Sequence, residues 1–456
     1  MHKLLFLSGL ICLTACAAGP DYVRPDIKAP DNWSVEYHTA ADLANARWWQ
    51  QFGDPVLDDL ISASVQGNLD LKAATARVDQ FLGVLDTTRS QYFPQVSAGI
   101  SGGVQQQKSA MTENYQATVN ASWELDLWGR IRRSNEAAQA RIVASEAGRR
   151  AVIMTVVSNV ASSYLTLRGL DRQLEIARDT EKTYEDSLKL FQLRFKYGTI
   201  SQLEISQAQS QYEAARQAVP NLESQVRQQE NLLSLLLGRP PGPIPRGRSL
   251  DELTPPAIPA GLPSELLERR PDIIQAEQAL IAANAEVGAA KAEYFPKISL
   301  TGALGVAGGD IGKLFVPGAG IGSAAGQLVA PILNRGAISG QVKQAESQKE
   351  QALYHYQQAV LTGFREVEDA LIKTTKGREQ LEAQQRQVHS LLEYGRLSRL
   401  QFEAGRTNYL QVLDADRSLF SGKLDYTQTK YELLTRIVSV YKAMGGGWID
   451  KADTIK

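Results

Sequence analysis

The sequence predicts a mainly helical chain with a membrane-spanning β part, built from a helix-strand-strand-helix-helix unit that occurs twice. Three observations support this fold class. Residues 130–195 and 335–403 contain no proline and are rich in Ala, Arg, Glu, Gln and Leu, a composition that favours helix. Four other segments alternate apolar and polar residues, the period of a β-strand. Motifs in the first half of the chain return in the same order about 200 residues later, which indicates a duplication.

The N-terminus has the layout of a secretory signal peptide in residues 1–15, with a positive Lys3 and a short apolar stretch. The residues before Cys16 resemble the lipobox of bacterial lipoproteins, which predicts a covalent lipid on Cys16. The neutral Ala17 that follows favours the outer membrane of a Gram-negative cell. An ordinary signal peptide with an unrelated cysteine is the alternative. Residues 16–57 are expected to form a lipid-anchored extended segment.

The duplication rests on two pairs of matching motifs. Tyr92-Phe93-Pro94 corresponds to Tyr294-Phe295-Pro296, and residues 194–208 correspond to residues 400–415. We therefore expect a first repeat over residues 58–238 and a second over 264–445, followed by a tail, 446–456. Residues 239–263 hold eight of the 18 prolines, so they are predicted to form a connecting loop.

The extended runs predict strands at about 92–107, 113–127, 296–308 and 319–333. The alternation is strictest from Asn114 to Leu127, where the odd positions are apolar and the even positions polar. Such runs suit transmembrane strands with one face toward lipid and the other toward a lumen. Four strands cannot close a barrel, so two, three or four copies would have to associate. A soluble two-faced sheet is the alternative.

The helical stretches predict two long hairpins, at about 130–238 and 335–445. At 1.5 Å per residue each first helix would be about 100 Å long, which exceeds a globular domain. Gly198 and Gly405 are expected at the turns, and Pro220 is expected to kink one returning helix. Antiparallel pairs of this length would form a tube or a stalk.

Composition excludes several other classes of protein. The 49 Lys and Arg balance 50 Asp and Glu, which excludes an electrostatically driven nucleic-acid binder. With two Cys and four His, the chain has no disulfide framework and no cluster with zinc spacing. A nucleotide-binding loop and a nucleophile elbow are also absent. We therefore expect neither an enzyme nor a cofactor beyond the lipid on Cys16.

The segment from Glu265 to Gly302 resembles the most recognisable stretch of the TolC-like outer-membrane factors, specifically their lipoprotein branch. Further matches are GPDYVRP after Cys16, WWQQFGDPVLDDLI from Trp48, WELDLWGRIRRSNEA from Trp123 and NYLQVLDADRSLF from Asn408. The resemblance implies a homotrimer with a 12-stranded outer-membrane β-barrel, continued by a long α-helical barrel across the periplasm. It also implies an exit duct that docks on a periplasmic adaptor and an inner-membrane transporter of the resistance-nodulation-division (RND) class.

The resemblance assigns roles to two groups of residues. It implies that the turns Tyr197-Gly198-Thr199 and Ala404-Gly405-Arg406 are the tips at which the adaptor docks, although a glycine turn is equally a simple helix C-cap. The periplasmic gate matches Asp414 and Leu410. Gln411 stands where some members carry a second Asp, so a double acidic ring is in doubt. For Asp414, the alternative is a solvated place on a helix surface.

The expected function is passive conduction of small molecules delivered by these partners. An alternative with the same fold and another cargo is a type I secretion duct that exports polypeptides. A periplasmic adaptor is the rival from another class, but adaptors have one long helical hairpin, whereas this chain predicts two. The sequence does not indicate the cargo.

Overall fold

The computed structural model describes residues 17–27, 30, 33, 47–107, 110–256 and 266–446. The predicted signal peptide, Cys16 and residues 447–456 of the predicted tail lie outside these ranges. Contacts divide the chain into two units. The sheet unit comprises residues 1–28, 75–148 and 272–359, and the hairpin unit comprises residues 29–74, 149–271 and 360–456.

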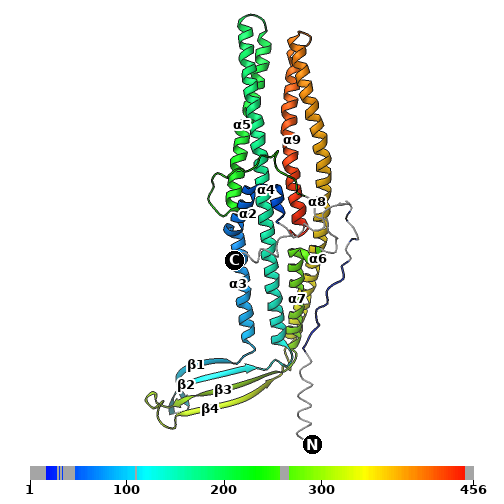
Figure 1. Cartoon of the computed structure of the whole chain (residues 1–456). Coiled ribbons are helices and arrows are strands. Elements are labelled where there is room, and N and C mark those ends of the chain that lie inside the picture. Colours follow the sequence, from blue (N-terminus) through cyan, green and yellow to red (C-terminus); the bar gives the residue numbers. More distant parts are fainter. Residues whose placement is uncertain are drawn as a thin grey trace. The chain divides into compact units, whose positions relative to one another are not determined.

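The sheet unit contains one antiparallel sheet in the order β1-β2-β3-β4 (Figure 1). Its strands are β1 (Gln95–Gln107), β2 (Ala110–Glu124), β3 (Lys297–Gly308) and β4 (Gly320–Val329). Each lies within one of the four extended runs or overlaps it. Since β2 pairs directly with β3, the two repeats meet along one strand pair in the middle of the sheet.

The register gives the sheet two chemically different faces. Val119 of β2 lies opposite Ala98 of β1 and Leu304 of β3, and Leu304 in turn lies opposite Gly322 of β4. Their neighbours along each strand point to the other face, which carries Ser, Thr, Asn, Gln and small residues, together with Ile321 and Val329 of β4. Alternation along β1, β2 and β3 therefore gives one continuous apolar face, because these strands are paired in phase, and β4 extends it with glycines, Ala324 and Leu328.

Two strands stop earlier than the sequence predicts. β2 stops at Glu124, three residues before the predicted end, because the Asp126 carboxylate accepts hydrogen bonds from the N–H groups of Ile131 (2.9 Å) and Arg132 (2.8 Å). That bonding starts a helix where the apolar alternation still continues. β4 stops at Val329 rather than 333, just before Pro331, which has no N–H for a ladder.

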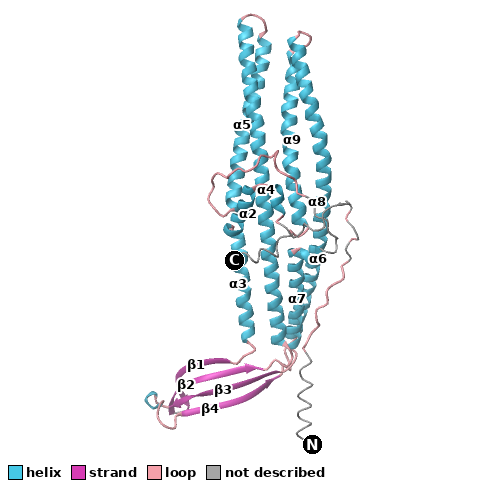
Figure 2. Cartoon of the chain, viewed as in Figure 1, coloured by secondary structure: helices cyan, strands magenta, loops and turns pink. Residues whose placement is uncertain are grey.

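The long helices form two hairpins of equal dimensions (Figure 2). In the first, α4 (Arg130–Lys196) has 67 residues and α5 (Gln202–Leu236) has 35. In the second, α8 (Ala337–Glu403) has 67 residues and α9 (Tyr409–Ala443) has 35. The identical lengths match the predicted duplication. Helix α5 continues without interruption through Pro220.

Shorter helices precede each strand pair. They are α2 (Pro55–Gly67), α3 (Leu69–Ser90), α6 (Leu266–Arg269) and α7 (Pro271–Ala292). The predicted extended segment to residue 57 is wrong at its end, because the 3-10 helix η3 (Trp48–Phe52) and the start of α2 already occupy it. Helix α2 begins early because the Asp54 carboxylate caps it, accepting from the Val56 N–H at 2.9 Å, and because Pro55 suits the first helical position.

The main core lies in the hairpin unit, where η3 and α2 pack against α4, α5 and α9. Trp48, Trp49 and Phe52 are buried there, with Trp48 stacked on Tyr441 at a centroid distance of 5.1 Å. The two tryptophans are thus packing residues. No helix among the described residues carries an apolar stretch of the length needed to cross a membrane.

Candidate functional site

The two hairpins end in turns of the same construction. Gly198 follows α4 with φ of 73°, and Gly405 follows α8 with φ of 67°. The N–H of Thr199 donates to the Arg194 carbonyl at 3.0 Å, and the N–H of Arg406 donates to the Gln401 carbonyl at 2.8 Å. These are Schellman turns, in which glycine takes the left-handed conformation at no steric cost.

The predicted tip residues form exposed surfaces at both turns. Tyr197 is 71% exposed, and Gly198, Thr199, Ala404, Gly405 and Arg406 are exposed as well. A methyl group at either glycine would meet no described atom within 4 Å. These glycines therefore serve backbone conformation, and the space around them is open to a partner.

Aromatic packing joins the two hairpins just behind their tips. Phe191 of α4 contacts Tyr409 of α9 at a centroid distance of 4.4 Å, and Phe402 of α8 lies 5.4 Å from Tyr409. Leu188, Ala208, Val412 and Leu413 complete this small core. Edge-to-face and tilted aromatic pairs of this kind add about 0.5–1.5 kcal/mol beyond the area that they bury.

The predicted gate residues lie in the first turns of α9. Leu410 and Asp414 are four residues apart on one helix face, and both are exposed, Leu410 by 58%. The Asp414 carboxylate accepts hydrogen bonds from the Tyr394 hydroxyl at 3.3 Å and from Arg417 at 3.1 Å. Gln411 belongs to the helix cap instead, since its N–H donates to Asn408 Oδ1 and its side chain accepts from Thr407.

A second carboxylate near the tip was not among the predicted site residues. Asp416 points to the other side of α9, where Arg399 of α8 donates to it at 3.1 Å. Burial raises the pKa of Asp416, and the Arg399 guanidinium only partly opposes this shift. Burial, together with the charge of Asp416, also raises the pKa of Tyr409 to about 12. A pair 17 residues apart across a turn leaves no local sequence signal.

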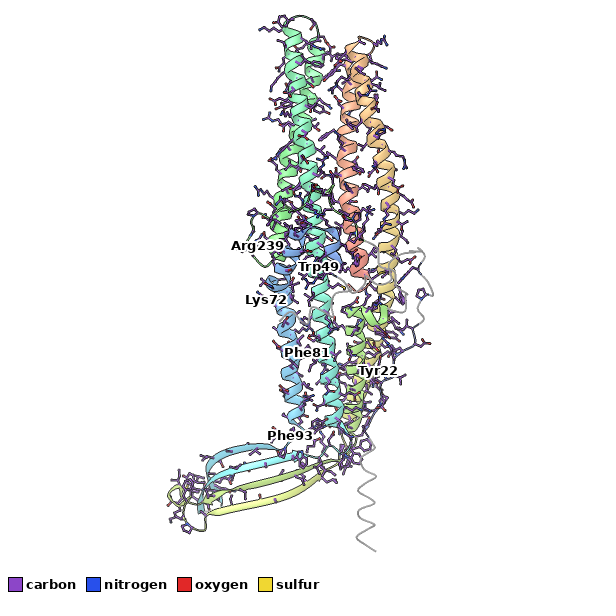
Figure 3. All side chains as sticks on the ribbon, viewed as in Figure 1. Tyr22, Trp49, Lys72, Phe81, Phe93 and Arg239 are labelled. Carbon is purple, nitrogen blue, oxygen red and sulfur yellow. The ribbon has the colours of Figure 1, made fainter. Side chains whose placement is uncertain are left out.

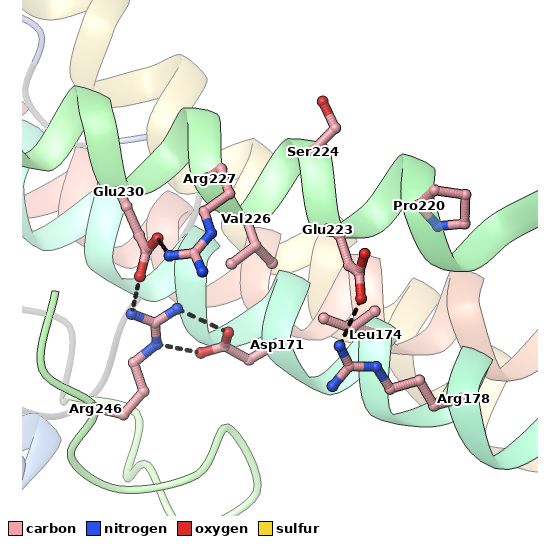
Figure 4. A pocket seen from close by; sticks show the side chains of 10 residues that line it. All are labelled: Asp171, Leu174, Arg178, Pro220, Glu223, Ser224, Val226, Arg227, Glu230 and Arg246. Carbon is pink, nitrogen blue, oxygen red and sulfur yellow. Dashed lines mark hydrogen bonds and ion pairs between the residues drawn. The ribbon is translucent and has the colours of Figure 1, made fainter. Parts of the chain in front are cut away.

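A cluster of charges lies where the connecting loop crosses the first hairpin (Figure 4). Arg246 of the loop binds both oxygens of Asp171 on α4 (2.9 and 3.2 Å) and also Glu230 on α5 (2.6 Å). Arg227 adds a second bond to Glu230 at 2.8 Å. Burial alone would raise the pKa of Glu230, but the bonds from Arg246 and Arg227 outweigh it and lower that pKa.

An open cleft of about 660 Å³ adjoins this cluster. Its three arginines and three carboxylates are all engaged with one another, since Arg178 also binds Glu223 at 2.6 Å. The charged groups therefore hold the loop and helices together and leave no net charge for a ligand. Within the described ranges, no three His, Cys, Asp or Glu side chains are grouped so as to hold a metal ion.

Comparison with known proteins agrees with this geometry. Residues 60–239 and 262–446 match the family model "Outer membrane efflux protein", one match for each repeat. The chain is 34% identical to the cation efflux system protein CusC of Escherichia coli O157:H7, over 98% of this chain and 99% of that protein. It is 36% identical to the toluene efflux pump outer membrane protein TtgC of Pseudomonas putida, over 96% and 94%.

Solved structures give the same result. A crystal structure of CusC superposes with a TM-score of 0.86 at 34% identity, covering 94% of this chain and all of that one. The open-state MtrE outer membrane channel of Neisseria gonorrhoeae superposes with a TM-score of 0.87 at 29% identity, covering 95% and 98%. The protein described here therefore belongs to the outer membrane efflux protein family.

Proposed function

We propose that this outer-membrane efflux protein is the exit duct of a tripartite pump, through which small molecules leave the cell passively. The observation that carries the proposal is the two-faced sheet, in which the apolar positions of β1, β2 and β3 coincide. An apolar face of this kind suits lipid, and the polar and small residues opposite suit a lumen.

Three copies would complete the duct. In the sheet as described, β1 and β4 are the edge strands, and each pairs on one side only. An open edge in lipid leaves backbone groups unsatisfied at a free-energy cost of several kcal/mol each. Pairing β4 of one copy with β1 of the next removes every edge, and a homotrimer gives 12 strands. The helical hairpins of the three copies would then continue the tube.

The partners would meet the duct at the two tips. A periplasmic adaptor would dock on Tyr197-Gly198-Thr199 and Ala404-Gly405-Arg406, whose exposure supports such a role. An inner-membrane transporter of the RND class would supply the cargo and the energy. Asp414, Leu410 and Gln411 would line the closed entrance, and a lipid on Cys16 would anchor the chain. We propose no enzymatic activity and no cofactor besides that lipid.

The cargo would be chosen by the partners rather than by this chain. The relatives of similar identity are named for different cargoes, a cation efflux system at 34% and a toluene efflux pump at 36%. Duct sequences this similar thus occur in pumps with unlike substrates. The class proposed is therefore small molecules in general, including drugs, solvents and metal ions.

The test is made on outer membranes from cells that express the chain. We expect it to fractionate with the outer membrane and to show, by native mass spectrometry, the mass of three lipidated copies. A strain lacking the gene should become hypersensitive to some members of a panel of antibiotics, dyes, bile salts and metal salts, and the intact gene should restore resistance. Recovery as a periplasmic monomer would refute the proposal.

A further inference from the structure

One edge of the sheet, at β4, lacks the neighbour that the equivalent inner strand has. β2 and β3 each pair on both sides, whereas β4 pairs only with β3 and is exposed throughout. The segments that lead from strand to helix differ in the same way. Residues 125–128, between β2 and α4, are half-buried, whereas Ile332 and Leu333, between β4 and α8, are 96% and 86% exposed. The β4 edge and this junction therefore form one uncovered surface.

The opposite edge, at β1, is uncovered as well. Phe93 precedes this strand and is labelled in Figure 3, and its side chain is 67% exposed. Its counterpart in the second repeat, Phe295, is 41% exposed and stacks on Trp128 of the first repeat at a centroid distance of 4.8 Å. Phe93 thus lacks the kind of neighbour that Phe295 has within the chain.

The repeat identifies equivalent residues in the two halves. Helices α3 and α7 both have 22 residues and begin at residues 69 and 271, which are 202 apart. Helices α4 and α8 both have 67 residues and begin at residues 130 and 337, which are 207 apart. The strands follow these two offsets. Val96 of β1 pairs with Ala121 of β2, and their equivalents, Ile298 and Leu328, also pair.

The contact between the repeats inside one copy is therefore a template for the contact between copies. Inside the copy, β2 of the first repeat pairs with β3 of the second. Just beyond β2, the Leu125 N–H donates to the Ile298 carbonyl at 2.9 Å. Around the proposed duct, the next contact joins the second repeat of one copy to the first repeat of its neighbour. There β4 takes the place of β2, and β1 takes the place of β3.

We propose that β4 of one copy pairs with β1 of the next copy in the register that the β2–β3 pair defines. Asn120 of β2 lies opposite Ala303 of β3, so Gln327 of one copy lies opposite Ser101 of the next. The inference rests on the function proposed above, because it needs the trimer. It adds the residues at which the copies join.

The side chains that this register brings together match on both faces of the sheet. On the apolar face, Leu328 lies opposite Ile100, so apolar surface continues from copy to copy. On the other face, Gln327 meets Ser101, and both are polar. A slip of one residue would place Leu328 opposite Ser101 or Gly99, which sets the apolar face of one copy against the polar face of the next.

The register also gives both halves of a copy the same stagger. A path across opposed residues from Val96 reaches Gly302 of β3, four residues beyond Ile298, the equivalent of Val96. Continued through β4, the path reaches Val104 of the next copy, which is again four residues beyond the equivalent position, Ile100. A closed barrel requires a fixed stagger and tilt of its strands. A shift by two residues would keep the faces in phase but make the two halves unequal.

The position of Pro331 fits this arrangement. Pro331 is the equivalent of Glu124, the last residue of β2. Successive residues of a strand direct their N–H groups to opposite sides, and the Leu125 N–H faces β3. The N–H that Pro331 lacks therefore belongs to the side of β3 in its own copy. The next N–H, that of Ile332, faces the neighbour and is placed to donate to the Val96 carbonyl there.

Disulfide cross-linking tests the register. A chain with Gln327→Cys and Ser101→Cys carries thiols on the two edge strands, which β2 and β3 separate, so these thiols can join only between copies. Opposed residues at such a non-hydrogen-bonded position have Cα atoms about 4.5 Å apart, within reach of a disulfide. After mild oxidation of outer membranes, we expect covalent trimers on a denaturing gel. The parent chain, whose cysteines are Cys12 and Cys16, is the blank.

Shifted pairs and an internal pair are the controls. Gln327→Cys with Gly99→Cys or with Gly103→Cys tests registers displaced by two residues, and a methyl group at either glycine meets no described atom within 4 Å. Diagonal neighbours lie about 7–8 Å apart, so we expect about tenfold less covalent trimer from these pairs. Asn120→Cys with Ala303→Cys is the matched positive control, because this pair lies inside one copy. It should oxidise as fully and remain a monomer on the gel.

The outcomes separate this inference from the proposed function. Ala325→Cys with Gly103→Cys is a second pair in the same register, in case the first pair disturbs folding. If the chain is a trimer in the outer membrane and a displaced pair cross-links better than both of these pairs, the register is refuted and the duct stands. Failure of both pairs while the internal control oxidises would also refute the register. A chain that is monomeric, or absent from the outer membrane, would refute the proposed function itself.

Discussion

Tyr164 joins three parts of the sequence at a single buried hydroxyl. It donates to the Asp54 carboxylate before α2 at 2.8 Å, and it accepts from the Gly247 N–H of the connecting loop at 2.9 Å. Asp54 also accepts from the Arg248 N–H at 3.0 Å. Burial and the bond to Asp54 raise the pKa of Tyr164, so this hydroxyl stays protonated at physiological pH.

Tyr164→Phe should therefore lower the free energy of unfolding by about 1–3 kcal/mol, because the part-buried Gly247 N–H loses its acceptor and the buried Asp54 carboxylate loses one of its donors. Thermal unfolding of the purified protein, followed by circular dichroism, measures the loss. Tyr354→Phe is the control, since the Tyr354 hydroxyl binds Glu350 on the exposed surface of α8. An equal effect of the two changes would mean that the buried hydroxyl contributes nothing specific.

Glu230 gives the attachment of the loop a dependence on pH. Its pKa lies below the ordinary 4.5, so its bonds to Arg246 and Arg227 contribute stability above that value. This contribution is lost as the pH falls from 4.5 through the lowered pKa. We expect Arg246→Gln to destabilise the protein at pH 7 and to weaken the fall in stability below pH 4.5. An unchanged profile of melting temperature against pH would contradict this role of Arg246.

Helices α4 and α9 approach each other closely at one glycine. A methyl group at Gly169 would lie 2.0 Å from the ring of Tyr431, so no larger residue fits there unless α9 shifts. Gly169→Val should therefore destabilise the hairpin unit by about 1–3 kcal/mol, the usual range for overpacking. The control is Gly83→Val in α3, where the methyl position meets no described atom. Denaturant unfolding of both variants tests the difference.

The regular parts of these elements could be predicted from the sequence because their signals are local. The alternation from Asn114 to Leu127 predicts a strand, and a long stretch without proline predicts a helix. Their ends were less accurate, because a single carboxylate such as Asp126 or Asp54 starts a helix earlier than the hydrophobic pattern indicates. A helix cap depends on a single side chain, whereas a hydrophobic pattern is an average over many residues.

The structure places the predicted tip residues at the two turns, and Leu410 and Asp414 on one face of α9; their roles stay predictions. The glycine turns could be predicted because a left-handed residue after a long helix requires glycine. The partners of Asp416 and Glu230 could not be predicted, because Arg399 and Arg246 reach them across a turn or a loop. The close approach of Gly19 to Gly288, 269 residues farther along the chain, likewise leaves no pattern in either segment.

In the whole molecule, the duplicated repeat and the two open edges of the sheet serve the same proposed assembly. In the proposed trimer, the two hairpins, each with helices of 67 and 35 residues, would give each copy two equivalent segments of the helical tube. The four strands of each copy would form a third of the 12-stranded barrel. In the proposed trimer, each residue near the axis would become a ring of three. A modest charge on one helix would then act three times at one level of the duct.

Asp414 and Arg417 make this consequence measurable. The Asp414 side chain is 50% exposed, and the more exposed Arg417 lies 3.1 Å away on the next turn, so an acidic ring would be partly neutralised by a basic one. Asp414→Asn should therefore reduce cation preference and Arg417→Gln should increase it, both without loss of trimer. Reversal potentials of single channels in planar bilayers under a salt gradient measure these opposite shifts. If neither change moves the reversal potential, Asp414 does not line the constriction, and its role is that of a solvated residue bound to Tyr394 and Arg417.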